Sequence, residues 1–276
     1  SFSSHQVIER ELMMQEEYPE MLNDFSGFMI RKYVPRAYSN LKGMAGLNLT
    51  PTIVLSTGML SPYYSPEAQD AFQKLAQIGA EDAKAAAATA KYNNILADMG
   101  FPPMMTGASE APYDILGDYF RGTMGIFEHM IDPDMEQACY MFAEQQIQSL
   151  QYFRFVDMPV KRVFFPLHKA MDGFMSDAQY ERFYWKPLKK IILALIDMGV
   201  TPYIYTEGPY RTRLHHLADV PKGKVFYHFE DVDMAEAKRV LGNTAAICGN
   251  LSISRMEFGR KEDIAEDVKR LLDICA

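Results

Sequence analysis

Four short runs decide the fold of this chain: Val163-Phe-Phe-Pro-Leu-His168, Tyr203-Ile-Tyr-Thr-Glu207, Val225-Phe-Tyr-His228 and Ala245-Ala-Ile-Cys248. Each run is apolar and closed by a polar residue, and helical patterns separate one run from the next. Short apolar strands that alternate with helices indicate a parallel sheet buried on both faces. Right-handed crossovers of this length close naturally into a barrel, so the fold class that we predict is α/β, a (β/α)8 TIM barrel.

The pattern extends beyond these runs in both directions. Thr52–Ser56 has the composition of a buried strand, which brings the convincing strands to five. The last strand is followed by a helix where a barrel needs another strand, so either the sequence lacks a C-terminal βα unit, which is the interpretation we favour, or the sheet is open. We predict a single barrel domain over residues 1–276, with an N-terminal helical extension at 1–45 and the barrel at 46–276.

Local signals mark the ends of several helices. Ser65-Pro66 and Asp132-Pro133 each open a helix with a proline at the first helical position, and Asp132 is expected to cap its helix. Ser176–Gln179 has the pattern of a capping box, and Pro187 is expected to kink or split the helix that follows it. The segment Gly107–Gly125 has the composition of a loop with a short helix.

Composition argues against several classes of function. The formal net charge is −8 and no basic run occurs, which argues against nucleic acid and anionic membranes as partners. No apolar run reaches the roughly 18 residues of a membrane span, and the acidic N-terminal segment does not have the order of a signal peptide, so we expect a cytoplasmic location. Three widely separated cysteines do not form a disulfide framework. Motifs of nucleotide binding and serine hydrolysis are absent.

Polar residues close three consecutive predicted strands at nearly even spacing. Glu207 and His228 are 21 positions apart, and His228 and Cys248 are 20 positions apart. Because the carboxyl ends of barrel strands converge on one axis, we predict that these three side chains form a metal site. A carboxylate, an imidazole and a thiolate with an open fourth position are typical of catalytic zinc. Simpler interpretations remain open: Cys248 as a small core residue, His228 as a hydrogen-bonded core histidine, and Glu207 as a helix cap.

A second group of candidates follows the first of the four runs. His168 and Asp172 leave the strand end and Tyr205 lies on the next strand, so these three are candidates for proton transfer or substrate orientation. Asp172-Gly173 is equally typical of a simple turn. His215-His216 lies in a polar helical stretch and is interpreted as a surface pair.

The chain is rich in flexible and flat apolar side chains, with 19 Met, 17 Phe and 16 Tyr. Core packing is the plainer explanation, and a pocket for a flat apolar ligand is the other. On the second explanation, four residues of the loops before the regular stretch are expected to wall an aromatic ring: Met104, Met105, Tyr113 and Phe120.

Several motifs from Gly100 onward match one known superfamily. They are Gly100-Phe-Pro, Ala111-Pro-Tyr-Asp-Ile-Leu, Arg121-Gly-Thr-Met-Gly, Leu167-His-Lys, Asp172-Gly-Phe-Met-Ser, Thr206-Glu-Gly-Pro-Tyr, Ala237-Lys, Leu241-Gly and Cys248-Gly-Asn. The sequence resembles the uroporphyrinogen decarboxylase superfamily, in its branch of cobalamin-dependent methyltransferases. The resemblance implies a (β/α)8 barrel. It also implies that a methyl group moves between a small donor or acceptor and a corrinoid on a separate protein.

Two departures from the superfamily's patterns refine this expectation. Its decarboxylases carry an arginine-rich N-terminal motif that grips propionates, and the nearest stretch here, Phe28–Tyr33, does not fit that motif. Its methanol and methylamine thiol methyltransferases carry a His-x-Cys zinc motif, of which only Cys248 remains because Ala246 replaces the histidine. The sequence is more similar to the methyltransferase components of anaerobic aromatic O-demethylases. Their zinc sites include Glu and His, which Glu207 and His228 would supply.

The expected function is therefore a zinc-dependent methyltransferase that moves a methyl group from a phenyl methyl ether to a corrinoid protein. Zinc would act as a Lewis acid on the ether oxygen. The alternatives are a uroporphyrinogen-decarboxylase-like enzyme without a metal, or a barrel that binds a corrinoid or an aromatic acid without catalysis. A homodimer is compatible with each of these expectations.

Overall fold

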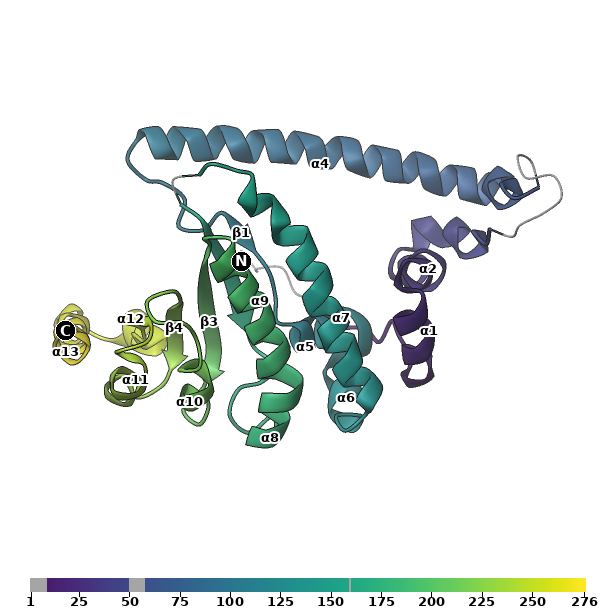
Figure 1. The fold of residues 1–276 in the computed structure, drawn as a ribbon. Helices are drawn as coiled ribbons and strands as arrows, with labels where there is room; N and C mark the ends of the chain where they lie inside the picture. Colours follow the sequence, from purple (N-terminus) through teal and green to yellow (C-terminus); the bar gives the residue numbers. More distant parts are fainter. Residues whose placement is uncertain (1–8, 50–57, 159) are drawn as a thin grey trace. The chain divides into compact units, whose positions relative to one another are not determined.

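The computed structural model describes residues 9–49, 58–158 and 160–276 (Figure 1). The chain forms two compact units: unit 1 contains Ser1–Pro103 and Tyr119–Gly125, and unit 2 contains Met104–Asp118 and Ile126–Ala276. A single barrel domain over 1–276 stays a prediction, and the expected strand Thr52–Ser56 lies outside the described residues. Within those ranges, no helix combines the length and the apolar character that crossing a membrane requires.

Unit 2 is built on a parallel sheet with the spatial order β1-β2-β3-β4-β5. The strands are β1 (Gly107–Ala108), β2 (Arg162–Leu167), β3 (Thr201–Pro209), β4 (Phe226–Asp231) and β5 (Ala246–Gly249). Sequential parallel strands are the arrangement of a partial (β/α)8 barrel, which confirms the predicted fold class. The four apolar runs become β2–β5. The pattern does not predict β1, because two residues carry no periodic signal.

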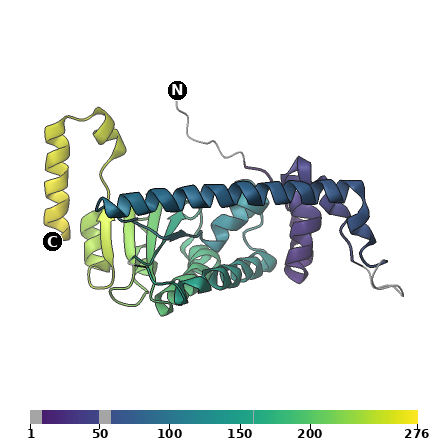
Figure 2. The same cartoon turned by 90° about the horizontal axis from the view of Figure 1, so that it is seen from above.

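Helices follow the strands of unit 2. They are α5 (Pro112–Ile115), α7 (Pro133–Ser149), α8 (Asp177–Gln179), α9 (Lys186–Asp197), α10 (Leu214–Leu217), α11 (Met234–Leu241), α12 (Ile253–Phe258) and α13 (Lys261–Cys275), with shorter turns η6 (Leu150–Arg154) and η7 (Tyr180–Trp185). Two elements, η5 (Leu116–Arg121) and α6 (Gly122–Glu128), contain residues of both units. α7 and α9 lie side by side (Figure 1). Figure 2 shows α12 and α13, in yellow, at the β5 end of the sheet.

The predicted capping signals set the ends of these helices. The Ser176 side chain accepts a hydrogen bond from the Gln179 N–H, and the Gln179 side chain accepts one from the Ser176 N–H, so the capping box is confirmed. Asp132 caps α7 by accepting from the Asp134 N–H at 2.8 Å. The helix around Pro187 is interrupted as expected. The π-helical turn η7 gives way to α9, which holds the proline in its first turn, where no N–H is needed.

The two faces of the sheet in unit 2 differ. One face carries fully buried side chains that alternate along β2, β3 and β4: Val163, Phe165, Leu167, Ile204, Tyr227 and Phe229. The second face carries partly exposed rings in contact with one another: Phe164, Tyr205, Phe226 and His228, together with the buried Tyr203. Burial of apolar area contributes about 25 cal/mol per Å², so the first face stabilises the fold, and the second face is where polar groups can meet a ligand.

Unit 1 is helical, as the sequence indicates for residues 1–45. Its elements are η1 (Gln15–Glu17), α1 (Tyr18–Asn23), α2 (Phe25–Phe28), η2 (Met29–Tyr33), α3 (Val34–Ala37), η3 (Ser39–Gly46), η4 (Ser61–Tyr64) and α4 (Pro66–Asp98). α4 begins at the predicted signal, where the Ser65 hydroxyl accepts from the Ala68 N–H at 3.1 Å. A hydrogen bond from Arg36 does most to lower the pKa of Glu17, to about 2, which keeps this nearly buried carboxylate charged.

Candidate active site at the strand ends

Backbone pairing places three of the predicted site residues in one row. Tyr205 of β3 pairs with His228 of β4, and His228 pairs with Cys248 of β5. Neighbouring strands lie about 4.8 Å apart, so side chains on one face at one level are neighbours. The rings of Tyr205 and His228 are 4.8 Å apart between centroids. The sheet therefore brings a phenol, an imidazole and a thiol together on its second face.

Glu207 lies outside this row. It stands two residues beyond Tyr205 on β3, which is about 6–7 Å further along a strand. The pairing of β3 with β4 also shifts register between Thr206 and Pro209, so the ladder that aligns Tyr205 with His228 does not continue to Glu207. This shift depends on the pairing partner and leaves no mark in the spacing of polar residues along the sequence.

The three predicted zinc ligands do not form a group that fits one ion. Donor atoms around a tetrahedral zinc ion lie about 3.3 Å apart. Among the described residues, one group has ligand atoms that all lie within 4.8 Å of one another, namely Asp177, His215 and His216. Glu207, His228 and Cys248 are not such a group, so we assign no reaction step to zinc at the strand ends.

The row of Tyr205, His228 and Cys248 is uncharged at neutral pH. Burial lowers the pKa of the His228 imidazole below its usual range, and its Nδ1 lies 2.8 Å from the Tyr203 hydroxyl. Burial raises the pKa of the Cys248 thiol to about 11, and the nearby Cys275 adds to the effect. The row thus offers hydrogen-bonding groups without a net charge.

A pocket of about 520 Å³ lies beside this row. Its polar lining comes from Tyr205, His228, Glu230, Cys248, Asn250 and Cys275. Apolar side chains of β5, α12 and α13 complete it, among them Ile247, Met256 and Leu272. No lysine or arginine is found among the described residues that line it. A largely apolar pocket with a few convergent polar groups is typical of a small-molecule site.

Sequence reasoning did not single out two residues of this region, Tyr203 and Glu230. Both were signalled by the period-two alternation of a strand, since Tyr203 precedes Tyr205 by two residues and Glu230 follows His228 by two. Glu230 Oε2 accepts a hydrogen bond from the Gly208 N–H at 2.6 Å, which ties the ends of β3 and β4 together.

A second cluster lies at the end of β2. His168 Nε2 is 2.6 Å from Asp118 Oδ2, and Lys169 Nζ is 2.8 Å from Asp118 Oδ1. The fully buried Asp114 accepts hydrogen bonds from the Tyr184 hydroxyl at 2.6 Å and from the Lys169 N–H at 3.1 Å. Asp114 Oδ2 also lies 3.7 Å from His168 Nδ1, so the imidazole stands between two carboxylates.

The pKa values in this cluster move in opposite directions. Burial raises the pKa of Asp114 to about 6. Burial opposes the charge on His168, but the hydrogen bond to Asp118 and the two nearby carboxylates raise its pKa to about 9. Burial likewise raises the pKa of Asp118, and the hydrogen bonds from His168 and Lys169 outweigh it and lower that pKa. A protonated His168 beside an ionised Asp118 is therefore the state at neutral pH.

Comparison with models of known protein families shows to which family the chain belongs. A family model described as uroporphyrinogen decarboxylase (URO-D) matches residues 67–276. This chain belongs to the uroporphyrinogen decarboxylase family. A search of curated proteins finds no match. Membership confirms the superfamily that the motifs indicated, and with it an enzyme of a superfamily that includes decarboxylases and methyltransferases.

In this uroporphyrinogen decarboxylase family member, sequence reasoning found only His168 of the cluster at β2. It missed Asp114, Asp118, Lys169 and Tyr184. A usable signal was present, because Asp114 and Asp118 have the i, i+4 spacing that puts two carboxylates on one helical face. The cationic partners His168 and Lys169 follow the end of β2. Because His168 is 50 positions after Asp118, no local sequence pattern predicts their contact.

Asp172, the other predicted catalytic residue after β2, braces a loop. Its carboxylate accepts hydrogen bonds from the Arg211 N–H at 2.8 Å and from the Thr212 hydroxyl at 2.6 Å. These contacts join the segment after β2 to the segment after β3. They favour the simpler interpretation of Asp172 as a structural turn residue, and a catalytic role for it stays a prediction.

The four residues expected to wall an aromatic ring have different environments. Met104 and Met105 belong to unit 2 and are exposed. Tyr113 is fully buried in unit 2 and packs against the ring of Tyr184, 5.9 Å away between centroids. Phe120 is buried in unit 1, with the Tyr33 ring 4.9 Å away. Packing accounts for the environments of Tyr113 and Phe120, and a substrate-binding role for all four stays a prediction.

Proposed function

We propose that this family member transfers a methyl group from a small neutral donor, such as a phenyl methyl ether, to a corrinoid on a separate protein. The observation that carries the proposal is the pocket beside Tyr205, His228 and Cys248, which has aromatic and aliphatic walls and no cation among its described lining residues. An uncharged apolar donor suits such a pocket, whereas a polyanion would enter it with its carboxylates unpaired.

The same pocket argues against a porphyrinogen as the substrate. A substrate with propionate groups needs cations, and the carboxylate of Glu230 would repel it. The cations His168 and Lys169 lie at the end of β2, are paired with Asp118, and do not line the pocket. Decarboxylation is the second candidate because a protonated His168 is a general acid, which can protonate the carbon that loses CO2.

In the proposed reaction His228 stabilises the leaving oxygen by a hydrogen bond. The corrinoid, as acceptor substrate, supplies the electron pair that bonds the methyl carbon; the O–CH3 bond breaks, and the phenolate that leaves needs a proton. When the Tyr203 hydroxyl donates to His228 Nδ1, the imidazole keeps its own proton on Nε2. A neutral His228, the form that burial favours, can then donate a hydrogen bond from Nε2 to the ether oxygen and to the phenolate that forms, and the phenolate takes its proton from water once it has left.

Anaerobic incubation of the full chain with free cob(I)alamin and an aryl methyl ether tests this function. We expect the absorbance of methylcobalamin to grow in step with release of the phenol. His228→Gln should slow the reaction about 10²-fold because the imidazole N–H that stabilises the leaving oxygen is lost. His129→Gln, a histidine outside the pocket, is the matched control and should keep the wild-type rate. Release of CO2 from a porphyrinogen without methyl transfer would replace the proposal with the second candidate.

Zinc at Glu207, His228 and Cys248 stays a prediction that metal analysis tests. The ligand atoms of these three residues do not all lie within 4.8 Å of one another, so their side chains have to approach before one ion can contact all three. Zinc in anaerobically purified protein that is lost in Cys248→Ala would support the prediction. Wild-type zinc content in Cys248→Ala would exclude that residue as a ligand.

A further inference from the structure

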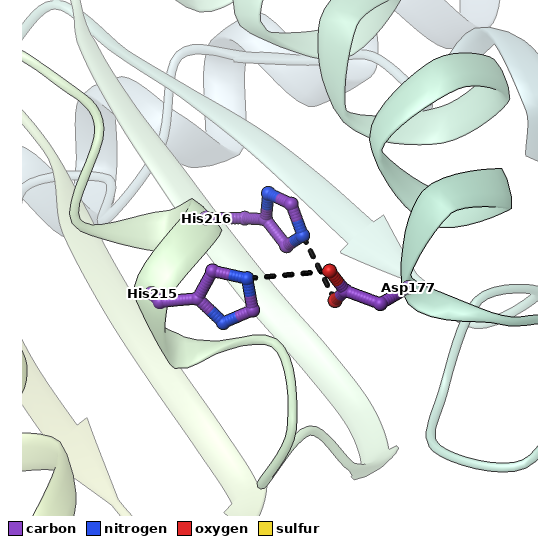
Figure 3. A group of neighbouring side chains, drawn as sticks. All are labelled: Asp177, His215 and His216. Carbon is purple, nitrogen blue, oxygen red and sulfur yellow. Dashed lines mark hydrogen bonds and ion pairs between the residues drawn. The ribbon is translucent and has the colours of Figure 1, made fainter.

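One carboxylate and two imidazoles meet where two loops of unit 2 approach each other (Figure 3). Asp177 is the first residue of α8, which follows β2, and His215 and His216 lie in α10, which follows β3. Figure 3 shows both rings turned toward the carboxylate. The sequence indicated only a surface pair of histidines, because the partner is 38 residues away along the chain.

Both imidazoles point a nitrogen at the same carboxylate. His216 Nε2 lies 3.0 Å from Asp177 Oδ1, and His215 Nε2 lies 3.5 Å from Asp177 Oδ2. The three ligand atoms all lie within 4.8 Å of one another. Two donor atoms of a tetrahedral zinc ion with bonds near 2.0–2.1 Å are about 3.3 Å apart. The two nitrogen–oxygen separations are close to that value and the ligand atoms all lie within 4.8 Å of one another, so the cluster is compact enough for one ion to contact all three residues.

We propose that Asp177, His215 and His216 bind one divalent transition-metal ion, zinc or a near relative such as nickel or copper. Two imidazoles with one carboxylate favour these metals over magnesium and calcium, which take oxygen ligands. Three protein ligands leave at least one coordination position for water. The site shares no residue with the zinc site predicted at the strand ends.

The surroundings of the cluster define the character of this site. His216 is nearly buried, and its ring packs on Tyr180 at 5.1 Å between centroids, so this ligand is held in place. The side chains of Asp177 and His215 are 54% and 60% exposed, so an ion can enter from solvent. Arg213 Nη1 lies 3.4 Å from Asp177 Oδ1, and its charge opposes a bound cation. The site therefore binds more weakly than a buried site of four protein ligands.

A bound ion would reinforce a junction that other contacts already form. Asp172 accepts hydrogen bonds from Arg211 and Thr212 across the same two segments, and Arg213 Nη2 donates to the Met175 carbonyl at 2.5 Å. An ion that binds the folded arrangement more tightly than the unfolded chain raises the melting temperature. The metal thus acts as a clamp between the loops that follow β2 and β3.

Titration of the metal-free full chain with zinc, against a chromophoric chelator, measures this site, and thermal unfolding with and without zinc gives a second readout. For the wild type we expect one zinc per chain that depends on Asp177, His215 and His216, and a rise in melting temperature. His215→Gln and Asp177→Asn should weaken binding by about tenfold or more and remove that rise. His215 is exposed, so its variant keeps the fold even where His216→Gln does not. His129→Gln is the control for histidines outside the cluster and should bind zinc as the wild type does.

His228→Gln separates this site from the one predicted at the strand ends. Zinc binding that is lost in His215→Gln and kept in His228→Gln supports the proposal. Binding that is lost only in His228→Gln, unchanged affinity in His215→Gln, or no zinc bound by the wild type overturns it. Methyl transfer is not measured, so the outcome is independent of the function proposed above.

Discussion

His168 Nε2 lies 2.6 Å from Asp118 Oδ2, and 50 residues of sequence separate the two. This pair joins the residue after β2 to η5, and Lys169 contacts the second oxygen of the same carboxylate at 2.8 Å. Partly buried, hydrogen-bonded charges stabilise a fold only while both partners keep their charge, so the pair makes the stability of unit 2 depend on pH.

The His168–Asp118 pair predicts a loss of stability at alkaline pH. The pKa of His168 is about 9 in the folded protein, above the value near 6.5 of an unfolded chain. Its contribution is therefore fully present below about pH 6.5 and is lost as the pH rises through 9. Free energies of unfolding in urea between pH 6 and 10 should fall for the wild type and change much less for His168→Gln. Parallel curves for the two proteins would show that the pair does not carry this dependence.

Asp114 predicts that the free energy of unfolding also falls as the pH rises between about 4 and 6. Its folded pKa of about 6 exceeds the ordinary value of 3.8, because burial disfavours the charged form. The proton is thus bound more tightly in the folded state, and stability falls as the pH rises from about 4 through 6. Asp114→Asn cannot ionise and should flatten this window, although it should cost about 1–3 kcal/mol at pH 4 through weaker acceptance from Tyr184. Urea unfolding at pH 4, 5 and 7 measures both effects, and an unchanged slope in the variant would contradict the assignment.

Cys248 is predicted to be a slow nucleophile. Its thiol pKa of about 11 leaves far less thiolate at pH 7.5 than an ordinary thiol with a pKa near 8.5 has, by a factor of roughly 10². Alkylation by iodoacetamide, followed by mass spectrometry of the peptide, should show this slow rate and a rise of about tenfold per pH unit up to pH 10. A small thiol compound in the same tube is the control. Rapid alkylation at pH 7.5 would show that the thiol is exposed to solvent.

Local patterns were sufficient to predict the fold and several of its helix ends. The runs that end at His168, Glu207, His228 and Cys248 are strands, as short apolar segments between helical patterns predict, although one face of the sheet carries partly exposed rings and is not fully buried as the pattern indicated. Ser65 and Ser176 cap helices because their hydroxyls reach an N–H three residues ahead. Each of these features depends on residues within a few positions of one another.

The site was predictable only where strand pairing is regular. His228 and Cys248 pair because consecutive strands follow in sequence order, which their spacing of 20 residues reflects, whereas the sequence pattern did not place Tyr205 beside them. Glu207 lies outside the row because Tyr205, two residues before it, is the residue of β3 that pairs with His228, and the spacing of polar residues along the sequence does not reveal that register. The contacts of His168 with Asp118 and of His216 with Asp177 join segments 50 and 39 residues apart, and such pairs emerge only from the folded chain.

Gly249, at the end of β5 in the lining of the pocket, predicts a large effect of a single methyl group. Its φ is +106°, and a Cβ built there would lie 2.0 Å from the Phe229 carbonyl oxygen, which is backbone and cannot rotate away. Gly249→Ala therefore combines left-handed strain of about 1–2 kcal/mol with overpacking of about 1–3 kcal/mol, a loss of about 2–5 kcal/mol in the free energy of unfolding. Gly223→Ala is the matched control, since its φ is +73° and nothing lies within 4 Å of the added carbon, so only the strain remains. Urea unfolding of both variants isolates the contact with Phe229 as their difference. Equal losses in the two variants would mean that β4 and β5 separate enough at this end to admit the methyl group, and that the pocket beside them is wider in solution.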